Sequence, residues 1–381
     1  MRRILLALVL ASTAALAQPW ANGYSHYRTI SVNGGQVPGT QTNFPMLVSG
    51  TFPFLKTAAN GGMVQNTCAQ GSMTVACDVI FTSDAAGSTV LAFEWELYSA
   101  TTGQAVVWIN VPSLSNGTVI YLWYGKASVT TFQGNVAGTW DANYKGVWHL
   151  KEAGTGAAAD YKDSTSNGNN STNTTNEPAQ VTGLVGYGES FAAANSYIAL
   201  AADPPTSGPA TFSAWVNLSA FSGTIYSSIF GKVQGAQTYG YGLEVSYASS
   251  TPYFTGVADS GDGTWGAAMS YANPSLNTWY YLVYTITGIG SGQTGTLYIN
   301  GLQAATYTGT SAVYSGYANV IGGSTSGTHT VGTIDEARIS NVVRSTAWIT
   351  ASYNNQKPGS TFYTVGTDNG AAFAGGGLII Q

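Results

Sequence analysis

Two carboxylates in the first half of the chain have a spacing that could support acid–base chemistry. Glu94 and Glu96 flank Trp95 in a run of strand-forming residues, and side chains two apart on a strand point to the same face, about 7 Å from each other. Glycosidases use carboxylate pairs at such distances. However, no third acid follows on this strand, and solvated like charges on an edge strand give the same pattern. We therefore expect no catalytic residue, and a glycoside hydrolase is the least favoured of three functional hypotheses.

A second group of candidate residues, in the other half of the chain, suits binding. The acidic run Asp259–Trp265 ends in an indole, and an indole beside a loop can stack on the apolar face of a sugar ring. Tyrosines near Gly-rich stretches offer a flat ring with a polar tip. The alternatives are that Trp265 belongs to the core and that the acidic run is a turn between strands. We predict that the ligand-binding residues are Trp265, Tyr241, Tyr253, Asp262 and Asn273.

Other catalytic or redox chemistry has little support. The three histidines, His26, His149 and His329, have no second histidine at metal-ligand spacing, and we expect each to be structural. Cys68 and Cys77 are nine residues apart in a chain that we expect to be exported, so we predict a disulfide that pins a local loop or hairpin. A metal site or a reactive thiol is less favoured, because no ligand-rich or basic stretch surrounds these cysteines.

The N-terminus indicates export. Residues 1–17 combine Arg2 and Arg3 with an apolar run and a small-residue site, which predicts a signal peptide cleaved after Ala17 and a secreted or cell-surface protein. No later stretch approaches the roughly 20 apolar residues of a membrane helix. Without the two arginines, ten basic residues face 17 acidic ones. Such an acidic balance disfavours nucleic acid and anionic membranes as partners.

Short strand-like segments recur along the rest of the chain, without amphipathic helices between them. This pattern predicts an all-β protein with two antiparallel β-sandwich or jelly-roll domains in tandem. We place the first domain at residues 18–135, the second at residues 141–366, and a Gly-rich tail at residues 367–381.

Three local signals in the second domain are specific. Asn300-Gly301 supplies the two positive-φ residues of a tight hairpin turn. Ser345 can cap a short helix over residues 346–354, which Pro358-Gly359 would end. In the segment 211–218, Phe212, Ala214, Val216 and Leu218 alternate with Ser213 and Asn217, so one face should pack inward.

Several motifs occur together in the order found in a known family. They are Gly146-Val147-Trp148-His149-Leu150, Asp163 to Asn170, Phe212 to Val216, Trp279 to Val283, Leu297 to Gly301 and Ile334 to Ile339. Over residues 146–366 the chain resembles laminin-G-like (concanavalin A-like) jelly-roll domains. The motifs Asn43 to Val48, Asp78 to Thr82, Val107 to Pro112 and Ile120 to Gly125 resemble a prokaryotic surface domain of unknown function.

The resemblance implies a fold and leaves the function open. Jelly rolls of this group often hold a structural calcium, and the resemblance suggests Asp335 and Asp163 as ligands, although both could be ordinary strand-end or turn residues. We favour a secreted, non-catalytic carbohydrate-binding or adhesion protein, with a polysaccharide, cell-surface glycan or surface protein as its partner. The second hypothesis is a structural or matrix protein that binds no sugar.

Overall fold

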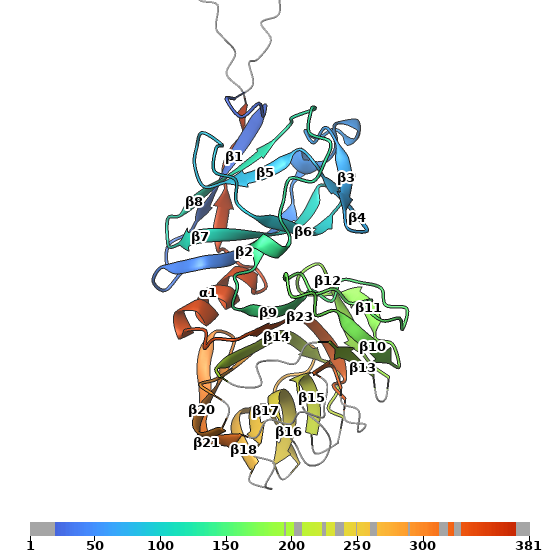
Figure 1. The fold of residues 1–381 in the computed structure, drawn as a ribbon, viewed down its shortest axis with the longest axis vertical. Helices are drawn as coiled ribbons and strands as arrows, with labels where there is room; N and C mark the ends of the chain where they lie inside the picture. Colours follow the sequence, from blue (N-terminus) through green and yellow to red (C-terminus); the bar gives the residue numbers. More distant parts are fainter. Residues whose placement is uncertain are drawn as a thin grey trace, which may run out of the picture.

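The chain folds into two β-rich domains, which lie one above the other in Figure 1. The structure is a computed structural model. It describes residues 20–370 except for the short segments 194–195, 202–207, 223–225, 233–239, 249, 260–264, 289, 312–318 and 324–328. The predicted signal peptide and the residues after Gly370 lie outside the described residues. No helix in the described part of the chain is long and apolar enough to cross a bilayer.

The first domain is a sandwich of two antiparallel sheets with an additional hairpin. One sheet has the order β24-β1-β8-β5, with β25 also paired to β1, and the other has the order β2-β7-β6. Large apolar side chains of both sheets, such as Phe81 of the first and Phe44 and Trp95 of the second, are buried in the core of this domain. The strands are β1 His26–Val32, β2 Gln41–Thr51, β3 Thr67–Gln70, β4 Met73–Ala76, β5 Val79–Thr82, β6 Phe93–Tyr98, β7 Gln104–Leu114, β8 Val119–Tyr124, β24 Tyr363–Val365 and β25 Asn369–Gly370.

The C-terminal strands correct the predicted domain boundaries. After leaving the second domain, the chain returns to the first, where Ile30 pairs with Val365 and Tyr27 pairs with Asn369. Asp368 fixes this return by accepting a hydrogen bond from the Tyr124 hydroxyl at 2.7 Å. The predicted boundaries place β24 at the end of the second domain and β25 in the tail, whereas their pairing with β1 shows that both belong to the first domain.

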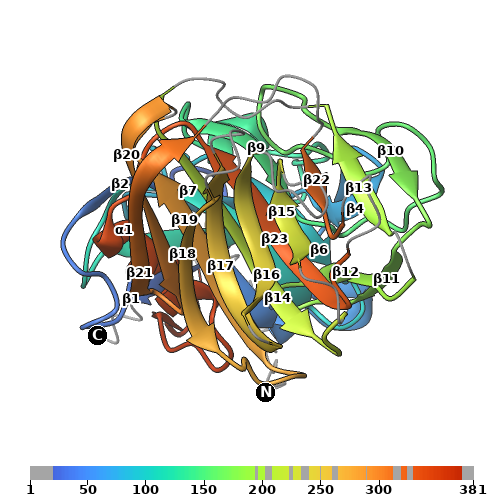
Figure 2. The same ribbon diagram turned by 90° about the horizontal axis from the view of Figure 1, so that it is seen from below.

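The second domain is a jelly roll of two larger curved sheets, seen from below in Figure 2. One has the order β10-β13-β22-β15-β16-β17-β18, and the other has the order β11-β12-β23-β14-β19-β20-β21, with β9 paired to β23. The strands are β9 Tyr144–Trp148, β10 Ser171–Thr175, β11 Ala179–Thr182, β12 Tyr187–Phe191, β13 Tyr197–Leu200, β14 Ala210–Leu218, β15 Tyr226–Gly231, β16 Tyr241–Ala248, β17 Thr251–Asp259, β18 Trp265–Ala272, β19 Trp279–Ile286, β20 Gly290–Ile299, β21 Leu302–Ser311, β22 Val320–Ile321 and β23 Gly332–Ser340.

The alternation in β14 explains how this domain is closed on both sides. Phe212, Ala214, Val216 and Leu218 are buried in the core between the two sheets, as predicted. The opposite face is buried as well, because Trp215 packs with Ile349 of the helix α1 (Thr346–Gln356). Figure 1 shows α1 between the two domains, so the outer face of this sheet forms part of the domain junction.

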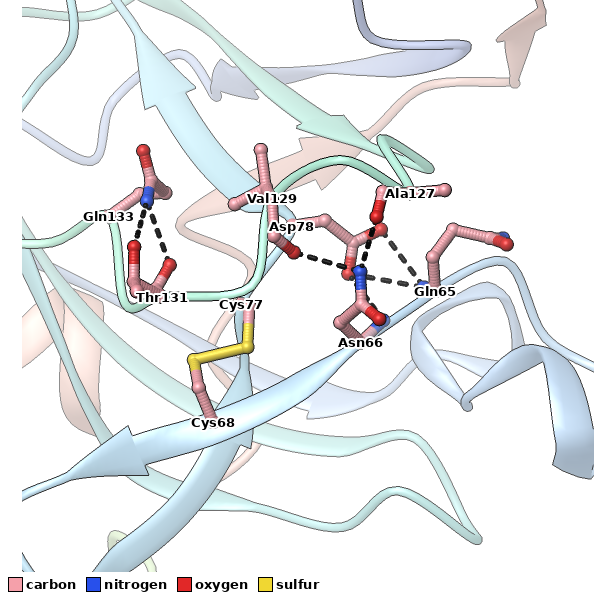
Figure 3. Close-up of a disulfide and its surroundings, with 9 residues drawn as sticks. All are labelled: Gln65, Asn66, Cys68, Cys77, Asp78, Ala127, Val129, Thr131 and Gln133. Atoms are coloured by element: carbon pink, nitrogen blue, oxygen red, sulfur yellow. Dashed lines mark hydrogen bonds between the residues drawn. A yellow bond between two sulfur atoms is a disulfide. The ribbon is translucent and has the colours of Figure 1, made fainter.

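The predicted disulfide is confirmed and lies in the first domain. Cys68 on β3 is bonded to Cys77, directly after β4, so the bond closes the β3–β4 hairpin (Figure 3). Next to it, the buried carboxylate of Asp78 accepts hydrogen bonds from the backbone N–H groups of Gln65 and Asn66. The hairpin and the following strand are therefore fixed by one covalent bond and one buried acceptor.

Candidate functional site

A cavity of about 670 Å³ lies where the two domains meet. Its lining comes from both domains: Met73, Glu94 and Glu96 belong to the first, and Lys151, Ser164 and Tyr187 belong to the second. Pockets between domains are common positions for small-molecule sites. The cavity therefore contains the carboxylate pair on β6, but in a setting that the sequence did not indicate.

Glu94 is buried rather than solvated, which corrects the expectation of an exposed edge strand. Only 1% of the residue is exposed. Its carboxylate accepts hydrogen bonds from the Trp140 indole N–H and from the Ser164 hydroxyl at 3.0 Å, and its Oε1 lies 3.2 Å from His149 Nε2. Strand β6 is an edge of its sheet, but the second domain covers the face that carries the acids.

Glu96 is buried in the same way but is less completely hydrogen-bonded. Its Oε2 accepts from the Trp108 indole N–H at 2.7 Å and lies 3.4 Å from His149 Nδ1. Its Oε1 has no hydrogen-bond partner among the described residues. Burial, and then the charge of Glu336, raise the pKa of the Glu96 carboxyl well above its usual range. The Glu96 carboxyl therefore holds a proton more readily than an ordinary glutamate does.

His149 connects the acids of the first domain to those of the second. Its Nδ1 lies 2.7 Å from Glu336 Oε1 on β23, and Glu336 is also paired with Arg338. Burial alone would lower the pKa of the imidazole, but Glu336, Glu94 and Glu96 outweigh burial and raise this pKa to about 10. The ring is therefore an imidazolium at neutral pH and donates from both nitrogens. We call Glu94, Glu96, His149, Glu336 and Arg338 the interdomain ion network.

The geometry of β23 aims Glu336 into this network. The pairing of β23 with β14 has a register shift between Ser213 and Trp215, opposite the stretch from Asp335 to Arg338. Within this bulge Glu336 has a φ of 54°, which is unfavourable for a residue with a side chain. Arg338, two residues further on, places its guanidinium 4.2 Å from the ring centre of Trp108 in the first domain. The bulge therefore directs two charged side chains of one domain at the other.

Within the described ranges, one group of acids and histidines has ligand atoms close enough together to hold a metal ion. It consists of Glu96, His149 and Glu336. The contacts favour an ion pair instead. Both imidazole nitrogens face carboxylates, and Arg338 already neutralises Glu336. The imidazolium thus occupies the position that a metal cation would take, and these residues fit a structural network better than a metal centre.

The mouth of the cavity offers groups that are free for a ligand. Tyr187, at the start of β12, is 39% exposed, which is unusual for a large aromatic side chain in this structure. The turn before it brings Gly186 so close to Glu96 that a Cβ would lie 2.4 Å from Glu96 Oε1. A φ of 60° at Gly186 also favours glycine. This turn therefore seats the hairpin β11–β12 against the first domain and leaves the Tyr187 ring at the opening.

The structure does not bring the predicted ligand-binding residues together. Tyr241 is fully buried in the core beside Phe212, so its ring cannot stack on a sugar, and we withdraw it from the site. Tyr253 pairs with Ala272, whereas Trp265 pairs with Asp259, at the other end of β17. Six residues of a strand span about 20 Å.

Only part of the predicted set is close in space. Tyr253 is half-buried, and Asn273, whose backbone N–H bonds to Pro252 O at 2.8 Å, is exposed at the same end of the hairpin. Asp262 lies outside the described residues, as does the side chain of Trp265. A single site cannot combine all five predicted residues.

The two predicted calcium ligands have protein partners. The carboxylate of Asp163 accepts from the N–H groups of Val147, Thr165 and Asn169 and from the Thr165 hydroxyl, all at 2.8–3.0 Å. Asp335 accepts from Val185 N at 2.9 Å. Within the described part of the chain, no group of three acids or histidines that is close enough to hold one ion includes Asp163 or Asp335. Calcium binding stays a prediction.

The sequence missed the cavity because its residues are far apart along the chain. Glu94 stands out by its spacing from Glu96 and His149 by its residue type, but no local pattern in the sequence links the two. Tyr187 stands in a Gly-Tyr-Gly stretch. Such a tyrosine between glycines, next to a turn, is a weak signal that could have marked it as an exposed ring.

Family comparisons agree with this two-domain architecture. Residues 192–350 match the concanavalin A-like lectin/glucanases superfamily, and residues 76–147 match a domain of unknown function, DUF2341. The predicted order of the two domains is thereby confirmed. No curated protein matches the chain.

Among solved structures, domain 4 of AbnA, an extracellular GH43 arabinanase from Geobacillus stearothermophilus in complex with arabinotriose, is 18% identical. That match covers 55% of this chain and 98% of the other, with a TM-score of 0.41. The binding domains of Paraclostridial Mosquitocidal Protein 1 and of botulinum neurotoxin serotype D are each 14% identical, cover 56% of this chain and have TM-scores of 0.41. This chain spans about half of those two chains, 52% in each case. Such low values say nothing about what this chain binds.

Proposed function

We propose that this protein, with its concanavalin A-like domain, is an exported, non-catalytic carbohydrate-binding protein whose ligand occupies the interdomain cavity. The observation that carries the proposal is the exposed Tyr187 ring at a cavity whose lining also includes carboxylates, lysines and hydroxyl groups. Sugars present apolar ring faces and many hydroxyls, so an aromatic surface next to carboxylates, amines and hydroxyls suits them. Met73 and Leu97 add apolar surface to the same lining.

The state of the two glutamates supports binding rather than hydrolysis. A catalytic acid or nucleophile must reach the scissile bond. Both carboxylates are almost fully buried, and three of their four oxygens already contact protein donors. Their side chains thus hold the two domains together and form the cavity floor.

Glycoside hydrolysis is the second candidate function. The observation in its favour is that Glu94 and Glu96 both line the cavity and that the pKa of Glu96 is raised by burial, which suits a general acid. A hydrolase would release reducing ends from a polysaccharide, and Glu96→Gln would abolish this release. Binding without any release of reducing ends supports the first proposal.

The binding experiment compares two tyrosines of the same domain. Purified protein is titrated calorimetrically with oligosaccharides from a polysaccharide panel. Tyr187→Ala should weaken binding about fivefold to twelvefold, since a stacked ring contributes about 1–1.5 kcal/mol. Tyr253→Ala, on the distant hairpin β17–β18, is the matched control and should bind as the unchanged protein does. The opposite outcome, loss with Tyr253→Ala alone, would move the site to the predicted rim.

Export is part of the proposal and has its own test. Residues 1–17 carry the features of a signal peptide, and the acidic, hydroxyl-rich composition suits an extracellular surface. Mass spectrometry of the secreted or surface-attached protein should give Gln18 as the first residue. Recovery from the cell interior with an intact N-terminus would refute export.

A further inference from the structure

The lining of the interdomain cavity contains more acidic than basic residues. Five of its lining residues are acidic, namely Glu94, Glu96, Glu152, Asp160 and Asp163, and only two, Lys151 and Lys162, are basic. The interdomain ion network compensates the two glutamates of the floor. The remaining acids belong to the wall formed by the second domain, and they determine which ligand the cavity prefers.

One carboxylate oxygen of the wall residue Glu152 lacks a partner. Its Oε2 is buried and accepts no hydrogen bond within the described structure. Burial raises the pKa of its carboxyl, although Lys151 and His149 act in the opposite direction. A buried carboxylate oxygen without a donor is costly, which makes Glu152 a position where a ligand donor would bind strongly.

Two further glutamates, Glu177 and Glu189, lie close to Glu152. Glu189 on β12 is fully buried, and neither of its carboxylate oxygens has a hydrogen-bond partner in the described chain. Burial and the charges of Glu152 and Glu177 raise the pKa of Glu189 to about 9. Glu177 Oε1 accepts from the Tyr161 hydroxyl at 2.7 Å. Three carboxyl groups therefore gather on this side of the cavity.

The lysines do not offset these acids completely. The Lys162 ammonium is exposed and donates to the carbonyl oxygen of Ala159. Asp160 stays ionised, because backbone hydrogen bonds, with that from Thr155 first, lower the pKa of its carboxyl. Asp163 accepts hydrogen bonds from four protein donors. A cleft lined mainly by one sign of charge attracts ligands of the opposite sign.

We propose that the cavity recognises an amino sugar, a glycan unit whose free primary amine points at Glu152 while its ring lies against Tyr187. This inference rests on the proposed carbohydrate-binding function and names the ligand class. An ammonium group supplies both the positive charge and the donors that Glu152 lacks. A neutral hydroxyl supplies only a donor, and N-acetylation removes the charge.

The test compares three oligosaccharides of equal length: glucosamine tetramer, its fully N-acetylated form and cellotetraose. Calorimetry at low salt and about pH 6, where simple primary amines are protonated, should show the amine form binding at least about tenfold more tightly than the other two. This preference should fall as salt is raised to about 0.5 M, because the charges are screened.

Two variants locate the preference. Glu152→Gln should bind the amine and N-acetylated tetramers with affinities within about threefold of each other. Lys151→Gln, at the neighbouring position, should strengthen the preference for the amine because a repelling charge is removed. The two variants should change the preference for the amine in opposite directions. Lys151→Gln therefore still tests the inference if Glu152→Gln folds poorly.

The outcomes separate this inference from the proposed function. Equal, Tyr187-dependent binding of all three tetramers would overturn the amino-sugar inference and leave carbohydrate binding intact. An amine preference that persists in Glu152→Gln and does not grow in Lys151→Gln would also overturn it. No binding of these or other oligosaccharides would defeat both. Equal competition by methylamine or a divalent cation alone would show a simple cation site and reject a sugar-specific one.

Discussion

His149 Nε2 lies 3.2 Å from Glu94 Oε1, and this contact joins a histidine of the second domain to a glutamate of the first. Both side chains are almost completely buried. The other imidazole nitrogen faces Glu336 of its own domain. A single charged ring thus links the two domains at the floor of the cavity, so the shape of the cavity depends on this ring.

Removing the ring should destabilise the protein strongly. We expect His149→Gln to lower the free energy of unfolding by about 3–5 kcal/mol, because buried Glu94 and Glu336 lose their shared cation. Urea unfolding followed by tryptophan fluorescence measures this change. Ser164→Ala is the control: it removes one hydrogen bond to Glu94 and should cost only about 1–2 kcal/mol. Equal effects of the two variants would argue against a central role for the imidazolium.

The network should make the protein less stable at alkaline pH. The pKa of His149 is raised to about 10 in the folded protein from 6.5. Its contribution is therefore complete below pH 6.5 and is lost as the pH rises from there towards about 10. Glu96 acts in the same direction, because its raised pKa keeps it protonated when the unfolded chain would ionise. Melting temperatures between about pH 6 and 10 should fall in the unchanged protein and fall less steeply in His149→Gln. Parallel curves would refute this origin.

The C-terminal strands should be required by the first domain. A chain that ends at Thr361 lacks β24 and β25 and exposes the edge of β1. It also loses the contact of Asp368 with the Tyr124 hydroxyl. We expect lower stability and increased aggregation, since unpaired strand edges promote association. A chain that ends at Gly370 is the matched control. Identical stability of the two truncated proteins would show that β24 and β25 contribute nothing.

Reduction of the disulfide should have a moderate effect. The bond joins Cys68 to Cys77, which are nine residues apart in the sequence. For a loop of this size, the loop-closure entropy predicts that the bond raises the free energy of unfolding by about 3 kcal/mol. Urea unfolding with and without a reductant measures the difference. Cys68→Ser/Cys77→Ser should match the reduced protein and should not respond to the reductant. An unchanged midpoint after complete reduction would contradict the prediction.

Local signals in the sequence were sufficient for several elements. Asn300 and Gly301 have φ values of 52° and 79° in the turn between β20 and β21, as the dipeptide predicts. Ser345 caps α1 by accepting from Trp348 N, and the helix extends to Gln356, two residues beyond its predicted end. Such features depend on neighbours along the chain, which a single sequence shows directly.

Features that depend on the second domain packing on the first could not be predicted. The alternation around Glu94 and Glu96 indicates correctly that they share a face, but not that another domain covers it. Likewise, Tyr241 has the sequence surroundings of a surface tyrosine and yet lies in the core between two sheets. Burial against a distant element produces no periodic pattern in the local sequence. The sequence therefore predicts exposed positions for Glu94, Glu96 and Tyr241, whereas the structure buries all three.

Hydrogen–deuterium exchange with a bound oligosaccharide tests the position of the site most directly. If the ligand lies between the domains, residues 70–73 of the first domain and 183–187 of the second should become protected together, while residues 252–273 remain unchanged. Protection confined to residues 252–273 would contradict this account and place the binding surface on the far side of the jelly roll.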